Sequence, residues 1–379
     1  MASRLATRPE RAKVVNRSKT ISLFSGCGGK DLGAEEAGAK IVFANDISKD
    51  ACSTLRKYFP STQILEGDIA EISSFPDADL VIGGYPCQSF SMGGNRDPHK
   101  DHRTFLYQHF ARCLEQVNPK YFVAENVDGL QKIQQGTFLE SQTELFRSSG
   151  EFGYEVSVAR LDARDYGVPQ KRKRLFIVGV RKDIGHVFAF PAPTHGKASP
   201  KKPHLMPYAS HGEVVKDLPA WPKGEFYERP HDPEGHWSWY YMSRNRKAKW
   251  DAPSYTIVAN WRHITLHPAS PVMKLVWSDL KNGWKQKWEF SNEFEHLKCH
   301  PERMRLPEPR RLSWRECARI QTFPPGFEPV GDTMSKFEQI GNAVPPLLAK
   351  VVISHLLSGK GLVPCRQPKS LLVSQLSLL

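Results

Sequence analysis

Short apolar runs alternate with helix-like segments over the first half of the 379-residue chain, and this alternation limits the possible folds more than any other feature. The runs are residues 21–24, 41–44, 80–82, 121–124, 155–161 and 175–180. Between two of these runs, Leu106, Phe110 and Leu114 recur at the spacing of an amphipathic helix. Strands and helices in alternation are typical of an α/β domain with a mostly parallel sheet. The sequence therefore predicts an α/β fold for this part of the chain.

The alternation stops near residue 185. From there to about residue 310 the chain is rich in Pro, Trp, His and basic residues, which indicates an irregular second domain. After residue 311 regular patterning resumes, and Val344, Leu348 and Leu356 fit one face of an amphipathic helix. We therefore expect a basic disordered extension over 1–19, an α/β domain built from 20–184 and 311–358, a second domain over 185–310 and a loose tail over 359–379.

The charge and hydropathy of the chain exclude several classes of protein. It carries 53 Lys and Arg against 40 Asp and Glu, a formal net charge of +13, which favours a polyanionic partner such as nucleic acid but also serves solubility. Hydrophobic residues make up 40% of the sequence, enough for a sizeable core, so wholesale disorder is excluded. No run reaches eighteen apolar residues and the start is polar and basic, so we expect neither a transmembrane helix nor a secretory signal.

Seven cysteines occur, an odd number, and none forms a C-x-x-C pair. This pattern disfavours both a disulfide framework and a structural zinc site, so we expect a reduced, cytoplasmic protein without a metal. In such a protein a cysteine is either a small buried hydrophobe or a reactive thiol. The position of each cysteine in the fold decides between these two alternatives.

A glycine-rich turn, FSGCGGKDLG, follows the first predicted strand at residues 24–33. Glycines at this place let a ligand approach the main chain at the carboxyl edge of the sheet. The dinucleotide fingerprint needs a third glycine where Asp31 stands, which disfavours a nicotinamide dehydrogenase and favours another adenosine cofactor. Asp46 ends the second strand, where an acid can bind ribose hydroxyls, and Asp68 ends a third strand, within reach of an adenine amino group. The alternative is a set of turn glycines and ordinary loop acids.

One cysteine lies in a chemically suggestive place. The buried strand at 80–82 runs into the loop GGYPCQSFS, so Cys87 follows the carboxyl end of a central strand and Pro86 stiffens the loop before it. A buried structural thiol is the alternative, but a polar loop is a poor core site. The next strand ends in ENV, and Glu125 lies beside the cysteine loop if the two strands are neighbours. A thiol and an acid at adjacent strand tips indicate covalent catalysis.

Taken in order, these motifs carry a resemblance. The set FSGCGG, Asp46, GDI, GGYPCQSFS, ENV, QKRKR and QIGNAVPP resembles the DNA (cytosine-5) methyltransferases of bacterial restriction–modification systems, over about residues 20–357. The resemblance implies a Rossmann-like S-adenosylmethionine-dependent methyltransferase fold, with residues 185–310 as a smaller target-recognition domain. It also implies double-stranded DNA as partner, and S-adenosyl-L-methionine as a cofactor that leaves as S-adenosyl-L-homocysteine, without a metal.

The resemblance assigns a cofactor site. Asp46 would hold the ribose hydroxyls and Asp68 the adenine amino group, with Asn342 and Val344 closing the pocket. The family often has a large aromatic residue after the ribose acid, and here that position is Ile47, so stacking on adenine is lost. The residues expected at the cofactor are Phe24, Gly26, Cys27, Gly28, Asp46, Ile47, Asp68, Ile69, Pro86, Leu106, Asn342 and Val344.

The resemblance also assigns catalytic roles. The Cys87 thiolate would attack C6 of a flipped-out cytosine and make C5 nucleophilic, while Glu125 holds N3 and the amino group. Within QKRKR, Arg174 would bind the O2 carbonyl and Arg172 would steady the cysteine loop; the alternative for this basic run is a solvated strand start. Loss of the C5 proton and of Cys87 would then give 5-methylcytosine.

Residues that read DNA are expected mainly in the irregular segment. Arg244, Arg246 and Arg262 lie in stretches similar to the bacterial enzymes that methylate GGCC, and arginine is the commonest bidentate reader of guanine. This predicts a short GC-rich palindrome as target, with Gln88 and Ser91 also contacting DNA. Some arginines could instead bind phosphates, and the Trp-, Lys- and Glu-rich segment 281–309 departs from that group.

Other functions stay open at this point. The main alternative is an RNA (tRNA) cytosine-5 methyltransferase of related fold, and a methyltransferase-like regulator without turnover is a second. For the DNA enzyme we expect a monomer in the bacterial cytoplasm, associated with the nucleoid and not with a membrane. It would protect host DNA from a restriction endonuclease without forming a stable complex with it.

Overall fold

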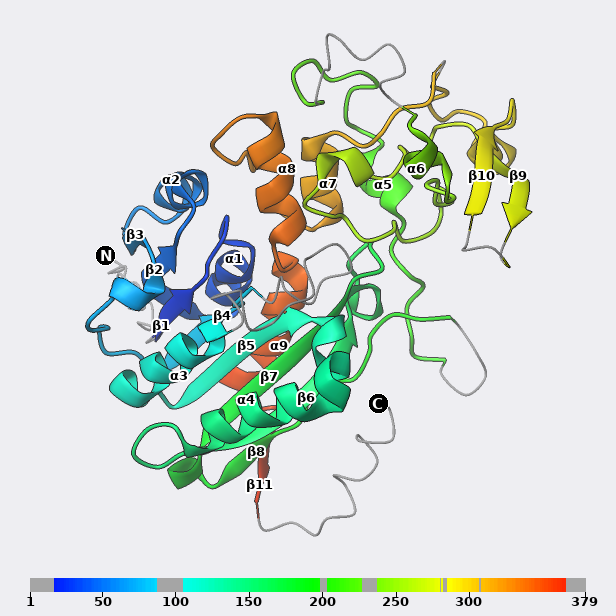
Figure 1. Ribbon diagram of the computed structural model, residues 1–379. Coiled ribbons are helices and arrows are strands. Elements are labelled where there is room, and N and C mark those ends of the chain that lie inside the picture. Colours follow the sequence, from blue (N-terminus) through cyan, green and yellow to red (C-terminus); the bar gives the residue numbers. More distant parts are fainter. Residues whose placement is uncertain are drawn as a thin grey trace, which may run out of the picture.

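The computed structural model of the chain describes residues 17–86, 105–197, 203–226, 237–279, 281, 285–306 and 308–365. Three of the residues expected at the site, Cys87, Gln88 and Ser91, lie outside the described residues. The described part holds a seven-stranded sheet with helices on both faces and, beside it, an irregular body with a β-hairpin (Figure 1).

The central sheet has the strand order β3-β2-β1-β4-β5-β7-β6. Neighbouring strands from β3 to β5 run parallel, whereas β7 is antiparallel to both β5 and β6. The strands are β1 (Ser18–Leu23), β2 (Ala39–Asp46), β3 (Gln63–Glu66), β4 (Leu80–Gly83), β5 (Tyr121–Val127), β6 (Tyr154–Asp162) and β7 (Lys173–Arg181). Apart from Phe24, which follows β1, each apolar run in the sequence falls in one of these strands, which confirms the predicted α/β fold. The order reverses between β1 and β4, where open α/β sheets bind ligands.

Helices cover both faces of this sheet. The longer ones are α1 (Gly29–Glu36), α2 (Lys49–Tyr58), α3 (Leu106–Val117), α4 (Thr137–Ser148), α8 (Thr333–Asn342) and α9 (Pro346–Leu357). Short 3-10 turns are η1 (Ile69–Glu71), η4 (Asp128–Gly136), η5 (Ala163–Tyr166), η6 (Lys182–Ile184), η7 (Trp261–His263) and η8 (Glu295–Lys298). In Figure 1, α3 and α4 lie on the near face of the sheet and α9 lies behind it.

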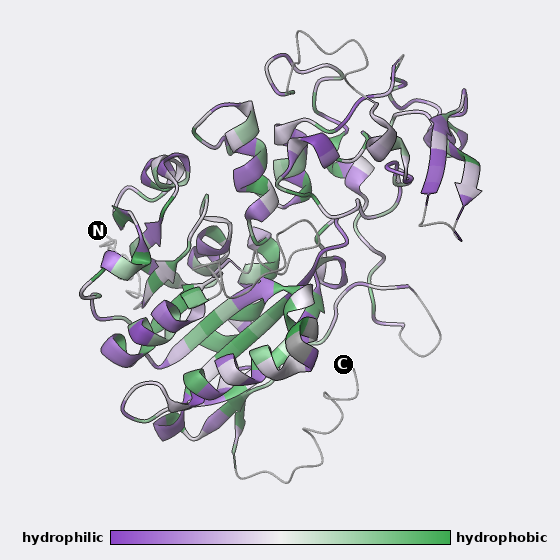
Figure 2. Ribbon diagram, in the orientation of Figure 1, coloured by the Kyte–Doolittle hydropathy of each residue, from purple (hydrophilic) through white to green (hydrophobic). Residues whose placement is uncertain are grey.

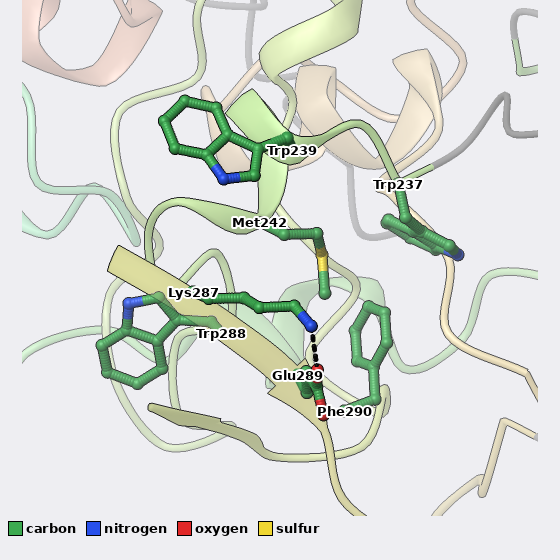
Figure 3. Close-up of a pocket in the computed structure, with 7 residues that line it drawn as sticks. All are labelled: Trp237, Trp239, Met242, Lys287, Trp288, Glu289 and Phe290. Carbon is green, nitrogen blue, oxygen red and sulfur yellow. Dashed lines mark ion pairs between the residues drawn. The ribbon is translucent and has the colours of Figure 1, made fainter. Parts of the chain in front are cut away.

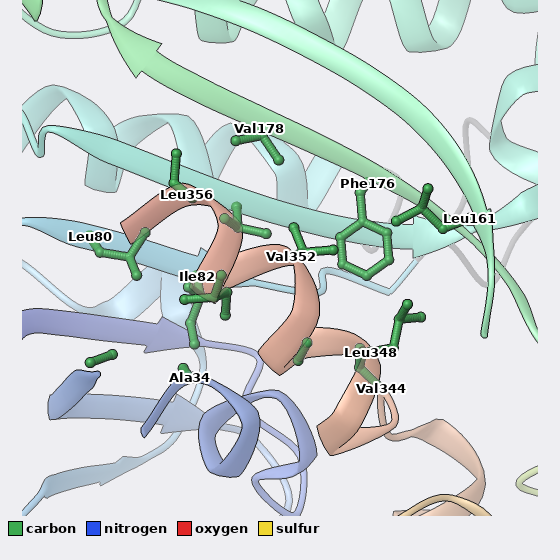
Figure 4. Packing of buried hydrophobic residues seen from close by; sticks show 14 of the residues in the cluster. Ala34, Leu80, Ile82, Leu161, Phe176, Val178, Val344, Leu348, Val352 and Leu356 are labelled. Carbon is green, nitrogen blue, oxygen red and sulfur yellow. The ribbon is translucent and has the colours of Figure 1, made fainter. Parts of the chain in front are cut away.

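The core is split by the sheet into two layers, because successive side chains of a strand point to opposite faces. On one face Leu80 and Ile82 of β4 pack with α9, and on the other Val81 packs with residues of α3 and α4. Figure 4 shows the first layer, in which Leu348, Val352 and Leu356 of α9 lie against the strands. Strands buried on both faces explain why the sequence shows continuous apolar runs and not alternation.

The segment Thr333–Leu357 is long and apolar enough to cross a membrane by length and composition, with a mean hydropathy of 1.4 in its best window. It consists of α8 and α9, which are separated around Val344 and Pro345. Of that window, 61% is buried inside the molecule, and the apolar side of α9 forms the core layer just described. Burial in the core accounts for the hydropathy of this segment.

The remaining elements build a body with little regular structure, here called the irregular region (residues 191–310). It contains α5 (His211–Val215), α6 (Trp239–Met242) and a hairpin of β9 (Met273–Asp279) and β10 (Lys285–Phe290). Helix α7 (Trp314–Ile320) follows this region in the sequence and lies between α5 and α8 in Figure 1. A shared cluster including Cys27, Ile257 and Trp314 joins the irregular region to the glycine loop.

Three short stretches differ from the expected domain limits. Ser18 and Lys19 begin β1, so they do not belong to a disordered extension. Strand β8 (His186–Phe188), expected in the second domain, pairs with β11 (Leu362–Pro364), expected in a loose tail. Both short strands lie against the α/β body, because Phe188 packs in its core. Three-residue strands that find a partner only through the fold leave no periodic signal in the sequence.

Candidate active site and cofactor site

The glycine loop between β1 and α1 has the conformation that its residue types predict. Gly26 and Gly28 have φ angles of 57° and 83°, in the left-handed region where glycine carries no steric cost. Phe24 also has a positive φ, 52°, which is uncommon for a residue with a side chain. A Cβ added at Gly29 would come within 2.5 Å of the carbonyl oxygen of Val344, so glycine lets the C-terminal segment close onto the loop.

Asp46 ends β2 with its carboxylate held by two backbone amides. Gly26 N–H donates to Oδ2 at 2.7 Å and Ser48 N–H donates to Oδ1 at 2.9 Å. The first bond ties the acid to the glycine loop, twenty residues away in sequence. Each carboxylate oxygen keeps a second acceptor position, which suits a ribose diol. Ile47, the next residue, is 73% exposed, so a flat ligand beside Asp46 would meet an aliphatic and not an aromatic face.

The other expected cofactor residues line the same carboxyl edge of the sheet. Asp68 is exposed after β3, and its Oδ1 accepts from Ala70 N–H at 2.9 Å. Ile69 is buried beside it and Leu106 is half-buried at the start of α3, both in one apolar cluster. Asn342 is exposed at the end of α8, whereas Val344 is 6% exposed.

The side chain of Cys27 points away from a cofactor site. Its thiol is fully buried, and its Sγ donates to the carbonyl oxygen of Gln339 at 3.3 Å. Burial raises the pKa of this thiol to about 12, so it stays protonated. This geometry leaves only the main chain of Cys27, and not its side chain, for the expected contact with a cofactor. The residue belongs to the apolar cluster that joins α7 and α8 to the glycine loop.

Lys30 was not expected at the site. Its side chain is only 7% exposed, and its ammonium donates to the carbonyl oxygen of Phe24 at 2.6 Å. The bond spans the glycine loop and holds Phe24 in its left-handed conformation. Lys30 also lines a small cavity together with Gly83, Glu125 and Val344. A lysine inside a helix is ordinarily a surface residue, so nothing in the sequence pattern pointed to this role.

The chain leading to Cys87 is fixed by contacts that the sequence did not reveal. The Tyr85 hydroxyl donates to Oε1 of Gln142 at 2.7 Å, and Nδ2 of Asn126 donates to the carbonyl oxygen of Tyr85 at 3.1 Å. The Tyr85 ring also packs edge-on against Phe24, with centroids 6.4 Å apart. The backbone two residues before Cys87 is thus anchored to both the glycine loop and the ENV segment. Pro86, the last described residue before Cys87, is half-buried.

Glu125 lies where the sequence placed it. Strands β4 and β5 are parallel neighbours with Gly83 opposite Ala124, so the strand tip before Cys87 adjoins Glu125. A Cβ at Gly84 would lie 3.0 Å from Oε2 of Glu125, and glycine therefore permits this approach. Arg174 Nε lies 2.9 Å from Oε1 of Glu125, with side chains 15% and 12% exposed. Burial lowers the pKa of Arg174 and Glu125 opposes that shift, so the two groups form a partly desolvated ion pair.

Arg172 is 1% exposed and acts within the framework of the site. Its guanidinium donates to the carbonyl oxygens of Ile257 at 2.9 Å, Gly341 at 2.8 Å and Ala343 at 2.8 Å. Burial, with nearby Arg174, lowers its pKa well below the usual value. These bonds connect β7, the irregular region and the segment before α9. The expected contact of Arg172 with the cysteine loop lies outside the described residues.

Comparisons with known proteins identify the class to which this geometry belongs. The family model described as C-5 cytosine-specific DNA methylase matches residues 18–358. The chain belongs to this family. It is a DNA (cytosine-5) methyltransferase of the restriction–modification type.

Curated relatives agree over most of the chain. The Type II methyltransferase M.BsuRI of Bacillus subtilis is 39% identical over 380 residues, which cover 90% of this chain and 79% of the relative. M.NgoPII of Neisseria gonorrhoeae is 35% identical over 348 residues, 88% of this chain and 94% of the relative. This family and these relatives favour the DNA enzyme over the RNA alternative that the sequence left open.

Solved structures agree on the fold. The S. pombe Dnmt2 methyltransferase superimposes with a TM-score of 0.59 at 20% identity, covering 91% of this chain and 99% of that one. A mutant DNMT2 of Spodoptera frugiperda gives 0.54 at 18% identity, covering 90% and 98%. The Rossmann-like methyltransferase fold expected from the motifs is confirmed.

The three candidate DNA-reading arginines of the methyltransferase lie close together. Arg244 and Arg262 are exposed, and Arg246 is partly buried with its Nε donating to the carbonyl oxygen of Tyr241 at 3.2 Å. Burial lowers the pKa of His263, and all three arginines, with Arg311, lower it further. Arg246 and Arg311 both lie over the Tyr241 ring, 5.0 and 4.4 Å from its centroid, and with the exposed Arg244 and Arg262 they form a positive surface near His263.

A buried ion pair between Arg310 and Glu316 lies next to the backbone that carries this positive surface. The guanidinium of Arg310 donates to Glu316 at 2.7 and 2.8 Å, a bidentate pair whose side chains are 3% and 1% exposed. Glu316 also closes the capping box of α7 with Ser313. The main chain of 310–312 in turn pairs with 265–267, and Leu266 N–H donates to the carbonyl oxygen of Arg246 at 3.0 Å. The ion pair thereby positions the backbone that carries Arg246.

Among the described residues of the methyltransferase, no cluster of three or more His, Cys, Asp or Glu side chains is arranged to hold a metal ion. The cofactor residues present do fit S-adenosyl-L-methionine. The glycine loop offers close backbone approach, Asp46 offers two acceptors at the neighbouring strand tip, and Ile69 and Leu106 offer apolar walls.

Proposed function

We propose that this methyltransferase transfers a methyl group to C5 of a flipped-out cytosine in a short, GC-rich, GGCC-like palindrome of duplex DNA, through a covalent adduct between Cys87 and C6. The observation that carries the proposal is the Glu125–Arg174 pair, fixed beside the strand tip that leads to Cys87. S-adenosyl-L-methionine supplies the methyl group when bound.

Cys87 activates the cytosine ring. Its thiolate adds to C6, a C6–S bond forms, and the π electrons of the C5=C6 bond move to C5, which becomes nucleophilic. After C5 has gained the methyl group, a base removes the C5 proton, the double bond reforms and the C6–S bond breaks. An ordinary thiol is only a few per cent ionised at neutral pH, so thiol addition and ring activation must be coupled.

Glu125 and Arg174 hold the ring during this addition. Glu125 takes the N3 edge and the exocyclic amino group, and Arg174 takes the O2 carbonyl. Their ion pair of 2.9 Å keeps the carboxylate in one orientation before the base arrives. Fixed donors and acceptors in a partly dry pocket stabilise developing charge better than mobile water does. Tyr85 and Asn126 are positioning residues, since their hydrogen bonds fix the segment that leads to Cys87. Arg172 is a positioning residue too, because it fixes the backbone at Gly341 and Ala343, beside the expected cofactor residues Asn342 and Val344.

The cofactor is held by the residues at the neighbouring strand tips. Asp46 binds the ribose hydroxyls, Asp68 the adenine amino group, and Val344 closes the pocket above the glycine loop. Support for this comes from the bond between Gly26 N–H and Asp46, and from the close approach of Val344 to Gly29. Ile47 stands where the family often has a stacking aromatic residue, so the face of the adenine ring packs on an aliphatic side chain and stacking is lost.

The DNA target is read from the irregular region. Arg244, Arg246 and Arg262 contact base edges, supported by their shared positive surface and by their resemblance to GGCC-methylating enzymes. Gln88 and Ser91 contact the DNA near the flipped base. Because C5 and C6 are stacked inside the duplex, the base must leave the helix, as it does in other base-modifying enzymes.

The biological role follows from the type of enzyme. We propose that the protein acts as a monomer in the bacterial cytoplasm, on nucleoid DNA, and protects the host from a restriction endonuclease of the same specificity. No stable complex between the two is needed, because each recognises the site independently.

Bisulfite sequencing of duplex DNA treated with the purified enzyme and S-adenosyl-L-methionine tests this proposal. We expect one cytosine of one short motif to resist conversion, and a transfer RNA substrate to stay unmethylated. Methylation spread over all sequence contexts would refute the role of the arginines in reading the target. Methylation of transfer RNA alone would refute the DNA assignment.

A further inference from the structure

The β9–β10 hairpin is the most exposed regular element of the irregular region. The two strands pair antiparallel from Met273 opposite Phe290 to Asp279 opposite Lys285. Beyond Met273, most of β9 faces solvent: Leu275, Val276 and Trp277 are 46%, 57% and 49% exposed. Figure 1 shows the hairpin standing at the outer end of the irregular region. Large exposed apolar side chains on a regular ribbon indicate a surface that meets a partner.

A cavity of about 470 Å³ lies between this hairpin and α6, bounded on one side by Trp237, Trp239 and Met242 and on the other by Trp288 and Phe290 (Figure 3). Phe290 packs edge-on against Trp237, with centroids 4.9 Å apart. This contact holds the base of β10 against the segment that leads into α6.

The hairpin continues the positive surface formed by the candidate DNA-reading arginines. Met273 at the base of β9 accepts from Arg246 N–H through its sulfur at 3.3 Å. From the α6 side, Tyr240 packs against His263 with ring centroids 5.0 Å apart, and His263 lies near the candidate DNA-reading arginines. The ribbon is therefore in direct contact with the segments that carry the arginines.

The charge of the ribbon matches that surface. Residues 273–290 carry four lysines, Lys274, Lys281, Lys285 and Lys287, against two acids, and β10 is largely hydrophilic in Figure 2. The pairs that Lys287 forms with Glu289 and Lys274 with Glu293 are exposed. Exposed ion pairs contribute little, so these lysines can exchange their partners for phosphates at small cost. Charge complementarity thus favours DNA over a protein as the occupant.

We propose that the β9–β10 ribbon is a second DNA-binding element, which contacts the duplex that flanks the target site. This inference rests on the proposed function, since it assumes that the arginines meet the target. A two-stranded β-ribbon fits the major groove of B-DNA. Its lysines bind backbone phosphates on the flank, and the exposed Trp277 packs against the sugar edges. The ribbon adds affinity for long DNA and leaves the reading of the target to the arginines.

The test compares two duplexes with the same central target, of about one and a half and about three helical turns, in binding titrations over a range of salt concentrations. The variant is Lys281→Gln/Lys285→Gln. We expect no change on the short duplex. On the long duplex, the slope of log K against log salt falls in magnitude by about 2, since each lost phosphate contact removes about 0.9.

Three further measurements separate this idea from the proposed function on which it rests. Lys40→Gln/Lys120→Gln removes the same charge from the sheet, away from the ribbon, and should change neither slope. Trp277→Ala should weaken binding to the long duplex without altering its salt slope. Methylation of the short duplex by the wild-type enzyme reports on the proposed function alone. If that methylation occurs but the ribbon variants bind both duplexes like wild type, the ribbon does not bind flanking DNA, and a protein partner becomes the better explanation of its apolar face.

Discussion

Arg174 Nε lies 2.9 Å from Oε1 of Glu125, at the tips of two neighbouring strands and with both side chains largely buried. The pairing is possible because β7 runs antiparallel beside β5 and brings a basic segment to the end of the ENV strand. A carboxylate and a guanidinium held together in this way present an acceptor and donors on one side of a pocket. The contact therefore links a feature of sheet topology to the proposed recognition of a planar, polar base.

Glu125→Gln tests that relationship. The substitution keeps the size of the side chain but removes the charge that orients Arg174 and offsets charge on the ring. We expect kcat for methylation of duplex DNA to fall about 100-fold to 1000-fold, the usual cost of losing one fixed electrostatic contact in a transition state. The affinity for S-adenosyl-L-methionine, measured by calorimetry, should be retained and shows that the variant is folded. A kcat within a few-fold of wild type would contradict the assigned role.

Asp46→Ala tests the cofactor site. The change removes the acceptor for the ribose and frees Gly26 N–H and Ser48 N–H, which the carboxylate now satisfies. A hydrogen bond to a charged group contributes about 1.5–3 kcal/mol, so the dissociation constant for the cofactor should rise about 10-fold to 100-fold. Calorimetric titration with S-adenosyl-L-homocysteine measures this directly.

Two further variants are compared with Asp46→Ala, one as a charge control and one as a test of stacking on adenine. Asp77→Asn removes a charge from an exposed loop of the same domain and should leave cofactor affinity unchanged. Ile47→Phe restores an aromatic face and should tighten binding by a factor of about 2 to 10, because aromatic stacking contributes about 0.5–1.5 kcal/mol. Weaker binding by Ile47→Phe would show that adenine does not lie on this residue.

The stability of the protein should fall in mild acid because of His211. This side chain is 1% exposed, its Nδ1–H donates to the carbonyl oxygen of Ala252 at 2.6 Å, and burial lowers its pKa to about 4. The unfolded chain has a histidine pKa near 6.5, so between these two values the unfolded state binds more protons than the folded state. Stability is therefore complete above pH 6.5 and is lost as the pH falls toward 4.

Urea unfolding at two pH values measures this effect. From about pH 7.5 to about pH 5, His211 alone should lower the free energy of unfolding by about 2 kcal/mol, at 1.36 kcal/mol for each pKa unit. His267, whose pKa burial also lowers, acts in the same direction. In His211→Gln, the change in the free energy of unfolding between the two pH values should be smaller than in the wild type by the contribution of His211, about 2 kcal/mol. If the free energy of unfolding of His211→Gln changes between the two pH values as much as that of the wild type, His211 is not held neutral.

Glu316→Gln tests the buried ion pair next to the candidate DNA-reading arginines. Because Arg310 is 3% exposed, the change leaves a buried guanidinium without its carboxylate and should cost about 3 kcal/mol in the free energy of unfolding. Discrimination between target and non-target duplexes should fall as well, since the pair positions the backbone around Arg246. Glu302→Gln, in an exposed pair with Arg303, is the matched control and should change stability by less than about 0.5 kcal/mol. Equal effects of the two substitutions would contradict a supporting role for Arg310 and Glu316.

The positions of the acids in the candidate site could be predicted from the sequence because these residues follow strand ends. Asp46 and Glu125 each come after an apolar run and Asp68 after the predicted third strand, and parallel strands bring their carboxyl ends to one edge. The neighbour relation between β4 and β5, on which the place of Glu125 depends, is confirmed by the register of Gly83 with Ala124. Local pattern and topology together thus determine the position of the acids.

Other features depend on contacts between distant segments, which a single sequence does not encode in its periodicity. The buried Lys30 is a charged residue in an ordinary helix until the fold closes the glycine loop over it. Cys27 turns its thiol to Gln339, 312 residues away, and so leaves the cofactor site to its main chain. Arg172 joins three carbonyl groups that only the complete fold brings together. The short strands β8 and β11 were not predicted from the sequence for the same reason.

The central claim is that Cys87 forms a covalent bond with the target cytosine, and trapping that bond tests it most directly. A duplex that carries 5-fluorocytosine at the target can undergo addition and methyl transfer, but fluorine cannot leave as a proton does, so the C6–S bond persists. Mass spectrometry of the digested complex after incubation with S-adenosyl-L-methionine should show the oligonucleotide attached to the peptide containing Cys87, and Cys87→Ala should give neither adduct nor methylation. An adduct on another cysteine, or methylation by Cys87→Ala, would contradict the account.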